Sequence, residues 1–211
     1  DFKYLAIIES GFENKVSPAG AAGFWQFMRA TGLSYGLEIN DEIDERYHLE
    51  KATIAACKYL RESYNKFDNW TLAAASYNIG PGGISSRVNK QNAGTYYAMT
   101  LPLETARYVF RIMAIKLIFN NPTTYGYYLR PTDLYPPLKL KTVEVKGAVN
   151  WVEFAQEHNC TYRVFREINP WIRSTTLTNK NGKTYLVQLP EEGGVLYSRL
   201  QENISDTQIW G

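Results

Sequence analysis

One acidic side chain, Glu9, lies in a setting that could support acid–base chemistry. It follows an apolar run over residues 4–8 and precedes Ser10, Gly11 and Phe12, so the sequence predicts a carboxyl group at the rim of a hydrophobic helix. Apolar burial disfavours the charged form of a carboxyl group and raises its pKa. A carboxyl group that stays protonated near neutral pH can donate its proton to a glycosidic oxygen. Taken alone, a Glu near a helix end is usually a solvated charge.

Three further segments mix polar with bulky apolar side chains. In residues 23–27 one amide stands among aromatic neighbours, and in residues 75–80 a tyrosine and an asparagine end an Ala-rich helix before a Gly-rich loop. Residues 102–109 begin a helix with a proline and an acid. Each segment alone is equally well explained by helix capping or core packing. Their candidate functional residues are Trp25, Gln26, Tyr77, Asn78, Glu104 and Tyr108.

Taken together and in this order, the four segments resemble the four motifs of the family 1 lytic transglycosylases, in particular those of the membrane-bound D type. The resemblance covers residues 2–120. It rests on Glu9-Ser10, Gly23-Phe24-Trp25-Gln26, Ser76-Tyr77-Asn78-Ile79-Gly80 and the segment from Glu104 to Val109. Residues 17–22, which begin with Ser17, are similar to the serine-containing loop of that family.

The resemblance implies a lysozyme-like helical fold, related to goose-type lysozyme. It implies an enzyme that cleaves the β-1,4 bond between N-acetylmuramic acid and N-acetylglucosamine in peptidoglycan and leaves a 1,6-anhydro end. Glu9 is then expected to be the sole general acid and base. By the same resemblance, the residues expected to bind sugars or to orient the Glu9 carboxyl group are Ser17, Trp25, Gln26, Tyr77, Asn78, Glu104 and Tyr108.

The sequence departs from the family motifs at two positions. Ser76 stands where the third motif usually has alanine, and Arg29 stands where proline is common after the second motif. Serine is only slightly larger than alanine, so the change at Ser76 is small. The change at Arg29 leaves open where the helix or loop after the second motif begins, without affecting the expected chemistry.

Two other functions stay open. Glycoside hydrolases usually flank the scissile bond with two carboxyl groups, but no second carboxylate of this chain stands in an equivalent motif, and Glu13 and Asp68 are expected to be surface charges. A muramidase similar to goose-type lysozyme would use water where a transglycosylase uses the 6-hydroxyl group of the sugar. The other alternative is a non-catalytic protein that binds peptidoglycan.

The elements that must position these residues are mostly helical. Apolar periodicity and helix-start signals predict helices over residues 2–12, 23–34, 49–67, 71–79 and 103–119. In the third of these, apolar steps of three and four predict one stripe formed by Ile54, Cys57, Leu60, Tyr64 and Phe67. The most apolar stretch, residues 108–119, is interrupted by Arg111 and Lys116, which indicates a buried helix rather than a membrane span.

The segment from residue 142 to 190 predicts a separate βααβ unit, with strands over 142–145 and 185–189 around helices over 150–158 and 162–168. It resembles a LysM module at Val145-Lys146-Gly147, Phe154-Ala155 and Ile168-Asn169-Pro170. Residues 147–150 lack the Asp and Thr of that family. Glycan binding and a packing role therefore both stay open for this unit.

The predicted fold class is mainly α (α+β), with a helical domain before a small mixed module. A lysozyme-like domain is expected over residues 1–120, and an extended Pro- and Tyr-rich connector over 121–141. The LysM-like module follows over 142–190. Residues 191–211 have weak amphipathic character and predict no element.

The charge and the cysteine content of the chain limit which classes of partner and site are expected. The formal net charge is +2 and no run of Lys or Arg is dense, which argues against nucleic acid as a partner. Cys57 and Cys160 are far apart and lie in no CxxC pattern, so we expect no disulfide framework, no metal site and no cofactor. Cys57 is expected to pack as a small hydrophobe in a helix.

The expected partners are the glycan strands of peptidoglycan, bound by a monomer. A location in the bacterial periplasm or cell envelope follows from that substrate. The chain begins at Asp1 rather than Met, so any targeting signal is expected to lie outside it. Membrane association is expected only through an anchor outside this sequence.

Overall fold

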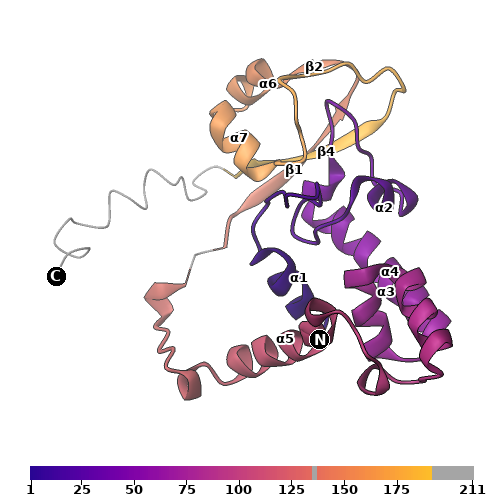
Figure 1. The fold of residues 1–211 in the computed structure, drawn as a ribbon. Helices are drawn as coiled ribbons and strands as arrows, with labels where there is room; N and C mark the ends of the chain where they lie inside the picture. Colours follow the sequence, from indigo (N-terminus) through magenta and orange to yellow (C-terminus); the bar gives the residue numbers. More distant parts are fainter. Residues whose placement is uncertain (135–136, 192–211) are drawn as a thin grey trace. The chain divides into compact units, whose positions relative to one another are not determined.

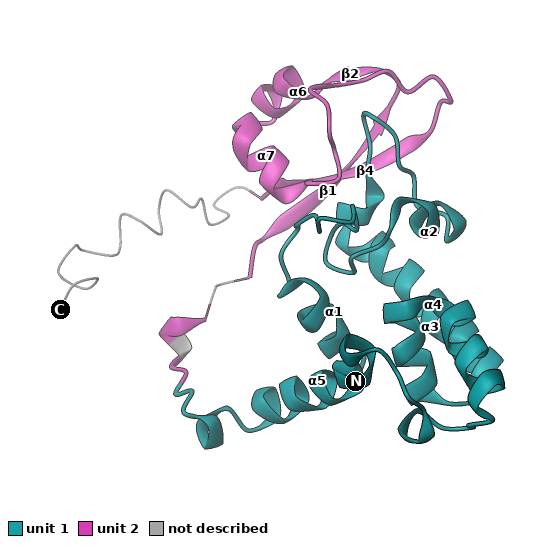
Figure 2. Ribbon diagram, viewed as in Figure 1, with its two compact units in different colours: residues 1–128 teal, residues 129–211 magenta. Residues whose placement is uncertain are grey.

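The computed structural model describes residues 1–134 and 137–191 (Figure 1). The chain divides into two compact units, Asp1–Tyr128 and Leu129–Gly211 (Figure 2). The first unit is built from helices and the second contains the strands, which confirms the predicted fold class. The finer division into four segments stays a prediction, and residues 192–211 of the expected C-terminal extension lie outside the described residues.

Five α-helices and three short 3₁₀ helices make up the first unit. In chain order they are α1 (Lys3–Ser10), α2 (Arg29–Ser34), η1 (Glu45–Tyr47), α3 (Leu49–Phe67), α4 (Trp70–Gln91), η2 (Tyr96–Ala98), α5 (Leu103–Asn120) and η3 (Pro122–Tyr125). Local signals fix their ends. The Asn69 side chain accepts hydrogen bonds from the first amides of α4, and Gly11 ends α1 in the left-handed conformation, with a φ of 69°.

Helices α3 and α4 pack against each other, and both bury several alanines. Small side chains allow two helices to approach closely, and the buried alanines on the two helices are Ala52, Ala55, Ala56, Ala73, Ala74 and Ala75. The apolar stripe predicted for α3 is wrong at two members, because Ile54 is 58% exposed and Cys57 is exposed. Leu60 is buried as predicted, and Phe67 packs against the core.

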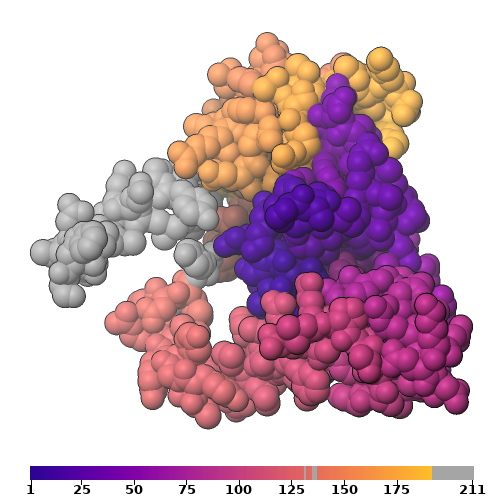
Figure 3. All heavy atoms as spheres, viewed as in Figure 1, coloured from indigo at the N-terminus to yellow at the C-terminus, as the bar shows by residue number. Residues whose placement is uncertain are grey.

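Only one face of α5 is buried, and much of this helix is visible at the molecular surface in Figure 3. Leu103 is 66% exposed, Phe110 is 52% exposed and Leu117 is 51% exposed. The prediction of a buried helix over residues 108–119 is therefore wrong for the outer face. Within the described residues, no helix is long and apolar enough to cross a membrane. The buried side chains of α5 are Thr105, Tyr108, Val109 and Ile112.

The helix predicted over residues 23–34 is wrong for its first half, because α2 covers Arg29–Ser34 only. Gly23 and Gln26 have φ angles of 79° and 48°, which no right-handed helix contains. A Cβ atom at residue 23 would lie 1.9 Å from the Arg46 carbonyl oxygen, so this turn requires glycine. Trp25 and Phe27 are both buried in the core, and this spacing of two is not one that a helix places on a single face.

Arg29 begins α2, at the position where the related motif commonly has proline. Its Nη2 donates a hydrogen bond to the Ile39 carbonyl oxygen at 2.8 Å. The side chain therefore anchors the start of the helix to a later loop. The departure at Arg29 leaves this helix start well defined.

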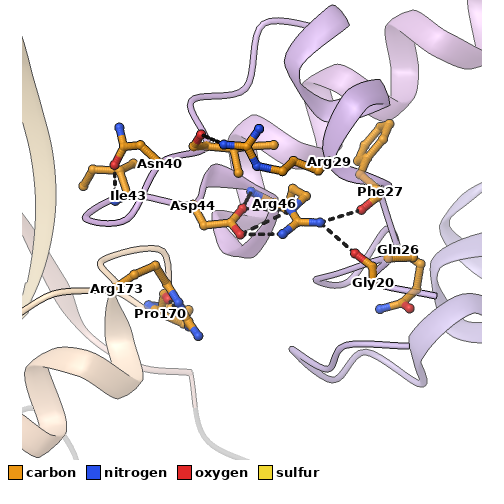
Figure 4. A network of polar contacts seen from close by, with 12 residues as sticks. Gly20, Gln26, Phe27, Arg29, Asn40, Ile43, Asp44, Arg46, Pro170 and Arg173 are labelled. Carbon is orange, nitrogen blue, oxygen red and sulfur yellow. Dashed lines mark hydrogen bonds and ion pairs between the residues drawn. The ribbon is translucent and has the colours of Figure 1, made fainter. Parts of the chain in front are cut away.

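Arg46, which follows α2 in the chain, pairs with Asp44 and also bonds to the segment before α2 (Figure 4). Arg46 Nη2 lies 2.7 Å from Asp44 Oδ2, and their side chains are 11% and 10% exposed. Nη1 of Arg46 donates to the carbonyl oxygens of Gly20 and Phe27, at 2.9 and 3.2 Å. The buried guanidinium is thus paired in charge and hydrogen-bonded, which is what its desolvation requires.

Gly80 interrupts α4, where its φ and ψ of 78° and 154° are non-helical. The predicted helix end at residue 79 identifies this break correctly. Pro81 follows, and the chain then resumes a helix to Gln91, because proline fits the first turn of a new helix. The sequence prediction misses this second half by treating the Gly-rich segment as a loop.

The second unit contains the predicted βααβ order with two additional short strands. Strands β1 (Leu140–Lys146) and β4 (Thr184–Pro190) pair antiparallel along their whole length. The short strands β2 (Val149–Asn150) and β3 (Thr176–Leu177) pair with each other. Two 3₁₀ helices, η3 of the first unit and η4 (Pro131–Asp133) of the second, lie within the connector that was predicted to be extended. The elements are η4 (Pro131–Asp133), β1 (Leu140–Lys146), β2 (Val149–Asn150), α6 (Trp151–Glu157), α7 (Tyr162–Ile168), β3 (Thr176–Leu177) and β4 (Thr184–Pro190).

Asn169 holds α7 against β4. It is fully buried, its Nδ2 donates to the Gln188 carbonyl oxygen at 2.7 Å, and its Oδ1 accepts from the Gln188 amide at 2.8 Å. The side chain therefore pairs with a strand residue as a neighbouring backbone would. Trp151 and Phe165 stack beside it in the core, with ring centroids 5.4 Å apart.

Candidate functional site

The C-terminal end of α1 presents Glu9. The next residue, Ser10, is 1% exposed, and its hydroxyl donates to the Phe24 carbonyl oxygen at 2.8 Å and accepts from the Phe12 amide at 3.1 Å. These bonds fix the end of α1 against the loop that contains Phe24. Glu9 is consequently held in one place while its side chain stays half-buried.

Tyr108 bonds directly to the Glu9 carboxyl group. Its buried phenol, on α5, donates a hydrogen bond to Oε1 of Glu9. The bond joins two packed helices that are far apart in sequence. Within the described part of the chain no residue bonds to Oε2 of Glu9, so this oxygen is free to exchange a proton with a bound molecule.

Burial raises the pKa of Glu9, as its apolar surroundings predict. The hydrogen bond from Tyr108 acts in the opposite direction, because it stabilises the carboxylate. The negative charge of Glu104 raises this pKa further, and the positive charge of Arg111 lowers it. Arg111 also donates to the Ile8 carbonyl oxygen at 3.4 Å. Desolvation thus favours the protonated form of Glu9, and charged and hydrogen-bonding neighbours on α5 adjust its pKa.

Tyr77 interacts electrostatically with Glu9 and bonds to the backbone of Trp25. The Tyr77 hydroxyl donates to the Trp25 carbonyl oxygen at 2.9 Å. Burial raises the pKa of Tyr77 well above its ordinary value, and the Glu9 charge adds to the shift. Trp25 is 5% exposed, and its indole nitrogen donates to Thr53 Oγ1 at 2.8 Å. Because the Trp25 ring packs in the core, little of its surface is accessible to a ligand.

Asn78 is joined to α5. Its Oδ1 accepts a hydrogen bond from Thr105 Oγ1 at 2.7 Å, and Thr105 is fully buried. The Asn78 side chain is half-buried. Two neighbouring residues of the third motif therefore reach different partners, because Tyr77 bonds to the loop after Gly23 and Asn78 bonds to α5.

Gln26 and Ser17 hold loops rather than contacting Glu9. Nε2 of Gln26 donates to the carbonyl oxygens of Lys15 and Gly23, at 3.0 and 2.8 Å. Ser17 Oγ accepts from the Ala21 amide at 3.0 Å. In the described segments neither side chain bonds to Glu9. Both are half-buried, so each keeps some surface for a ligand.

Glu9 interacts electrostatically with Tyr77, Tyr108 and Glu104. Asn78 is linked to this group through its hydrogen bond to Thr105 on α5. Sequence reasoning misses two residues here. Arg111 and Thr105 lie on the helix that carries Tyr108 and Glu104, and a spacing of three, four or seven places residues 104, 108 and 111 on one face. That spacing could have identified Arg111. The contact from Thr105 to Asn78 depends on tertiary packing.

No metal centre is apparent across residues 1–134 and 137–191, since no group of three or more His, Cys, Asp or Glu side chains could hold an ion there. Cys160 is buried and Cys57 is exposed, and both are free thiols. The expectation that Cys57 packs in the core is wrong, because it lies on the outer face of α3.

Two family models match separate parts of the chain. Residues 2–99 match the Transglycosylase SLT domain, and residues 141–193 match the Soluble lytic transglycosylase C-terminal LysM-like domain. Two relatives from different strains of Escherichia coli are both described as membrane-bound lytic murein transglycosylase D. Each is 28% identical to the chain over 97% of its length.

The match covers 45% of each relative, so the chain spans less than half the length of these proteins. The two family matches fall within the two compact units, one in each. They confirm the resemblances drawn from the motifs. Residues 2–99 are therefore similar to the transglycosylase SLT domain, and residues 141–193 are similar to the LysM-like domain that ends soluble lytic transglycosylases.

Proposed function

We propose that this chain is a peptidoglycan lytic transglycosylase, a carbon–oxygen lyase, in which Glu9 is the sole general acid and base. The observation that carries the proposal is the half-buried Glu9 carboxyl group, with a raised pKa and one oxygen bonded to Tyr108. The SLT domain and the names of the two relatives support the same reaction. The substrate is the β-1,4 bond between N-acetylmuramic acid and N-acetylglucosamine.

In the first step protonated Glu9 donates its proton to the glycosidic oxygen. The bond between this oxygen and the anomeric carbon breaks, and the N-acetylglucosamine side leaves as an alcohol. The acetamido oxygen of the muramic acid residue stabilises the anomeric carbon. A general acid is effective here because its pKa is raised toward the working pH.

In the second step the Glu9 carboxylate accepts the proton of the 6-hydroxyl group of the same sugar. The 6-oxygen forms a bond to the anomeric carbon, which yields a 1,6-anhydro end and returns Glu9 to its protonated form. No water is consumed. One carboxyl group therefore suffices where ordinary glycosidases need two.

Ser17, Gln26, Tyr77, Asn78 and Glu104 are proposed to bind the glycan or to shape the site around it. Tyr108 is proposed to orient Glu9. Trp25 is proposed to act through its carbonyl oxygen, which accepts the Tyr77 hydroxyl hydrogen. Replacing Tyr77 by phenylalanine keeps its ring, so a loss of activity would assign its contribution to the hydroxyl group.

The second unit is proposed to retain the protein on glycan strands, in a monomer located in the bacterial periplasm or cell envelope. Its family match and its separate core support an independent binding module. Its first loop, over residues 147–150, lacks two residues typical of glycan-binding members. A packing role is the alternative, and co-sedimentation of the second unit with sacculi distinguishes the two.

A test of the reaction is to digest purified sacculi in water enriched in oxygen-18 and to analyse the released muropeptides by mass spectrometry. A transglycosylase yields anhydro ends, lighter than reducing ends by one water molecule and free of the label. A muramidase yields labelled reducing ends, which would contradict the lyase reaction. A non-catalytic protein would bind sacculi and release nothing.

A further inference from the structure

A side-chain hydrogen bond between Thr105 and Asn78 joins α5, the helix that carries Tyr108, to the third motif on α4. Thr105 is fully buried near the start of α5, and its hydroxyl donates to Asn78 Oδ1 at 2.7 Å. The Thr105 backbone is fixed as well, because its carbonyl oxygen accepts from the Tyr96 hydroxyl at 2.8 Å. A rigid, buried donor therefore holds one end of a half-buried amide.

The chemistry of the two groups makes this bond directional. An asparagine amide has one acceptor oxygen and one nitrogen with two donors, and the two ends look alike in shape. A hydroxyl that donates to Oδ1 turns the nitrogen away from α5. Within the described residues no group accepts a hydrogen bond from Nδ2 of Asn78. The amide nitrogen therefore keeps its two hydrogens for donation to a bound molecule.

We propose that Thr105 is a positioning residue that makes Asn78 select N-acetylated sugars over de-N-acetylated ones. The carbonyl oxygen of an acetamido group accepts hydrogen bonds from Nδ2, whereas the ammonium group of a de-N-acetylated sugar is itself a donor and meets other donors. The inference deepens the proposed function, because it concerns which sugars the site near Glu9 accepts. It concerns binding, so it stands apart from whether Glu9 turns substrate over.

The test measures binding rather than turnover, with the full chain carrying Glu9→Gln. Chitotetraose and its fully de-N-acetylated counterpart are titrated in turn, and the side-chain amide resonance of Asn78 is followed by NMR. This resonance is assigned by its loss in Asn78→Asp. It reports on the first unit alone, so glycan bound elsewhere on the chain does not contribute.

Thr105→Val keeps the shape of the side chain and removes the hydroxyl. Loss of one neutral hydrogen bond corresponds to chitotetraose binding about 2- to 12-fold weaker, with a smaller preference over the de-N-acetylated oligomer. Thr105→Ser keeps the hydroxyl and should restore both. In a chain with Asn78→Ala, where binding is followed through the backbone amide resonance of residue 78, adding Thr105→Val should have no further effect, because the two residues act through one bond.

Ser76→Ala is a matched control. Ser76 is also fully buried on α4, but its hydroxyl donates to the Ala73 backbone carbonyl at 2.7 Å. This change should leave the acetamido preference intact even if the melting temperature falls. The proposal is overturned if Thr105→Val binds both oligomers as the parent does, or if it weakens binding equally with and without the Asn78 amide.

A second variant covers the case in which Thr105→Val does not fold. Asn78→Asp keeps an acceptor for Thr105 and replaces the amide donors by a carboxylate oxygen. The backbone amide resonance of residue 78 should then show a reversed preference, toward the cationic de-N-acetylated oligomer. An unchanged preference for chitotetraose would overturn the proposal. Either result is independent of whether the parent chain releases anhydro products.

Discussion

Glu9 is controlled by three side chains of α5 that act on its proton in opposite senses. The Tyr108 phenol and the Arg111 charge favour the carboxylate, whereas burial and the Glu104 charge favour the acid. Because the proposed first step needs the acid and the second needs the carboxylate, neither form should be too stable. The pH dependence of turnover therefore reports on these neighbours.

Tyr108→Phe should move the alkaline limb of the rate profile to higher pH. The change removes a donor to the carboxylate, so the Glu9 pKa rises and the acid form persists to higher pH. We also expect kcat to fall roughly ten- to hundredfold, because the carboxyl group loses its alignment. Steady-state rates between acidic and alkaline pH measure both effects. Tyr96→Phe removes another buried hydroxyl without touching Glu9 and should leave the limb in place.

Arg111→Met and Glu104→Gln should shift the same limb in opposite directions. Loss of the positive charge raises the Glu9 pKa and moves the limb to higher pH, whereas loss of the negative charge lowers it. Both residues are exposed, so the shifts should shrink as salt is added. Arg107→Met, on the same helix, is the control. Shifts of the same sign in the two variants would contradict this electrostatic account.

At the scale of elements, the loop over residues 23–27 places the Trp25 carbonyl oxygen that accepts the Tyr77 hydroxyl hydrogen. Its path depends on Gly23, whose amide donates to the Lys15 carbonyl oxygen at 3.0 Å. The Arg46 carbonyl oxygen lies where a Cβ would be. The backbone here is packed against backbone, which leaves no room for adjustment by a flexible side chain.

Gly23→Ala should destabilise the first unit by about 3 kcal/mol or more, because the added methyl group overlaps a backbone carbonyl. Gly20→Ala is the comparison, since its φ is also positive, at 85°, but nothing lies within 4 Å of its Cβ position. That change should cost only about 1–2 kcal/mol. Thermal melts followed by circular dichroism separate the two. Equal losses would show that conformational strain, rather than the overlap, decides.

The elements also show what sequence patterns can and cannot predict here. The predicted helices over residues 49–67 and 103–119 match α3 and α5, because long apolar periodicity is a strong signal. Two members of the α3 stripe are mispredicted because alanine carries little hydrophobic weight in such a pattern. The turn at Gly23 is mispredicted because a left-handed backbone leaves no periodic trace. Pairs such as Thr105 with Asn78 arise from helix packing.

At the scale of the whole molecule, the two units have separate cores. Tyr108 and Leu5 belong to the core of the first unit, and Trp151 and Phe165 are fully buried in the second. Glu9 and the residues that adjust its proton all lie in the first unit. The proposed chemistry therefore uses no residue of the second unit, whose proposed role is retention on the wall.

A chain that ends at Arg130 should fold and cleave soluble glycan fragments at a rate similar to that of the full chain, because the first compact unit ends at Tyr128. Its retention on sacculi should be weaker, as measured by co-sedimentation. Melting temperatures establish that the shorter chain is folded. If it folds but does not cleave fragments that the full chain cleaves, the proposed division of roles is wrong.

The central claim is that one carboxyl group serves both half-reactions, and Glu9→Gln tests it most directly. Glutamine preserves the shape of the side chain and can still bond to Tyr108, but it can neither donate a proton to the glycosidic oxygen nor accept one from the 6-hydroxyl group. A positioned acid or base is worth about 10² to 10⁴ in rate, and here one residue does both tasks.

The measurement is the rate at which anhydro-muropeptides are released from sacculi by the parent and by Glu9→Gln, with circular dichroism and sacculus binding as controls. The account predicts a rate at least about 10⁴-fold lower, with fold and binding retained. A folded Glu9→Gln protein that releases anhydro-muropeptides at nearly the parent rate would contradict the assignment of Glu9 and the mechanism built on it.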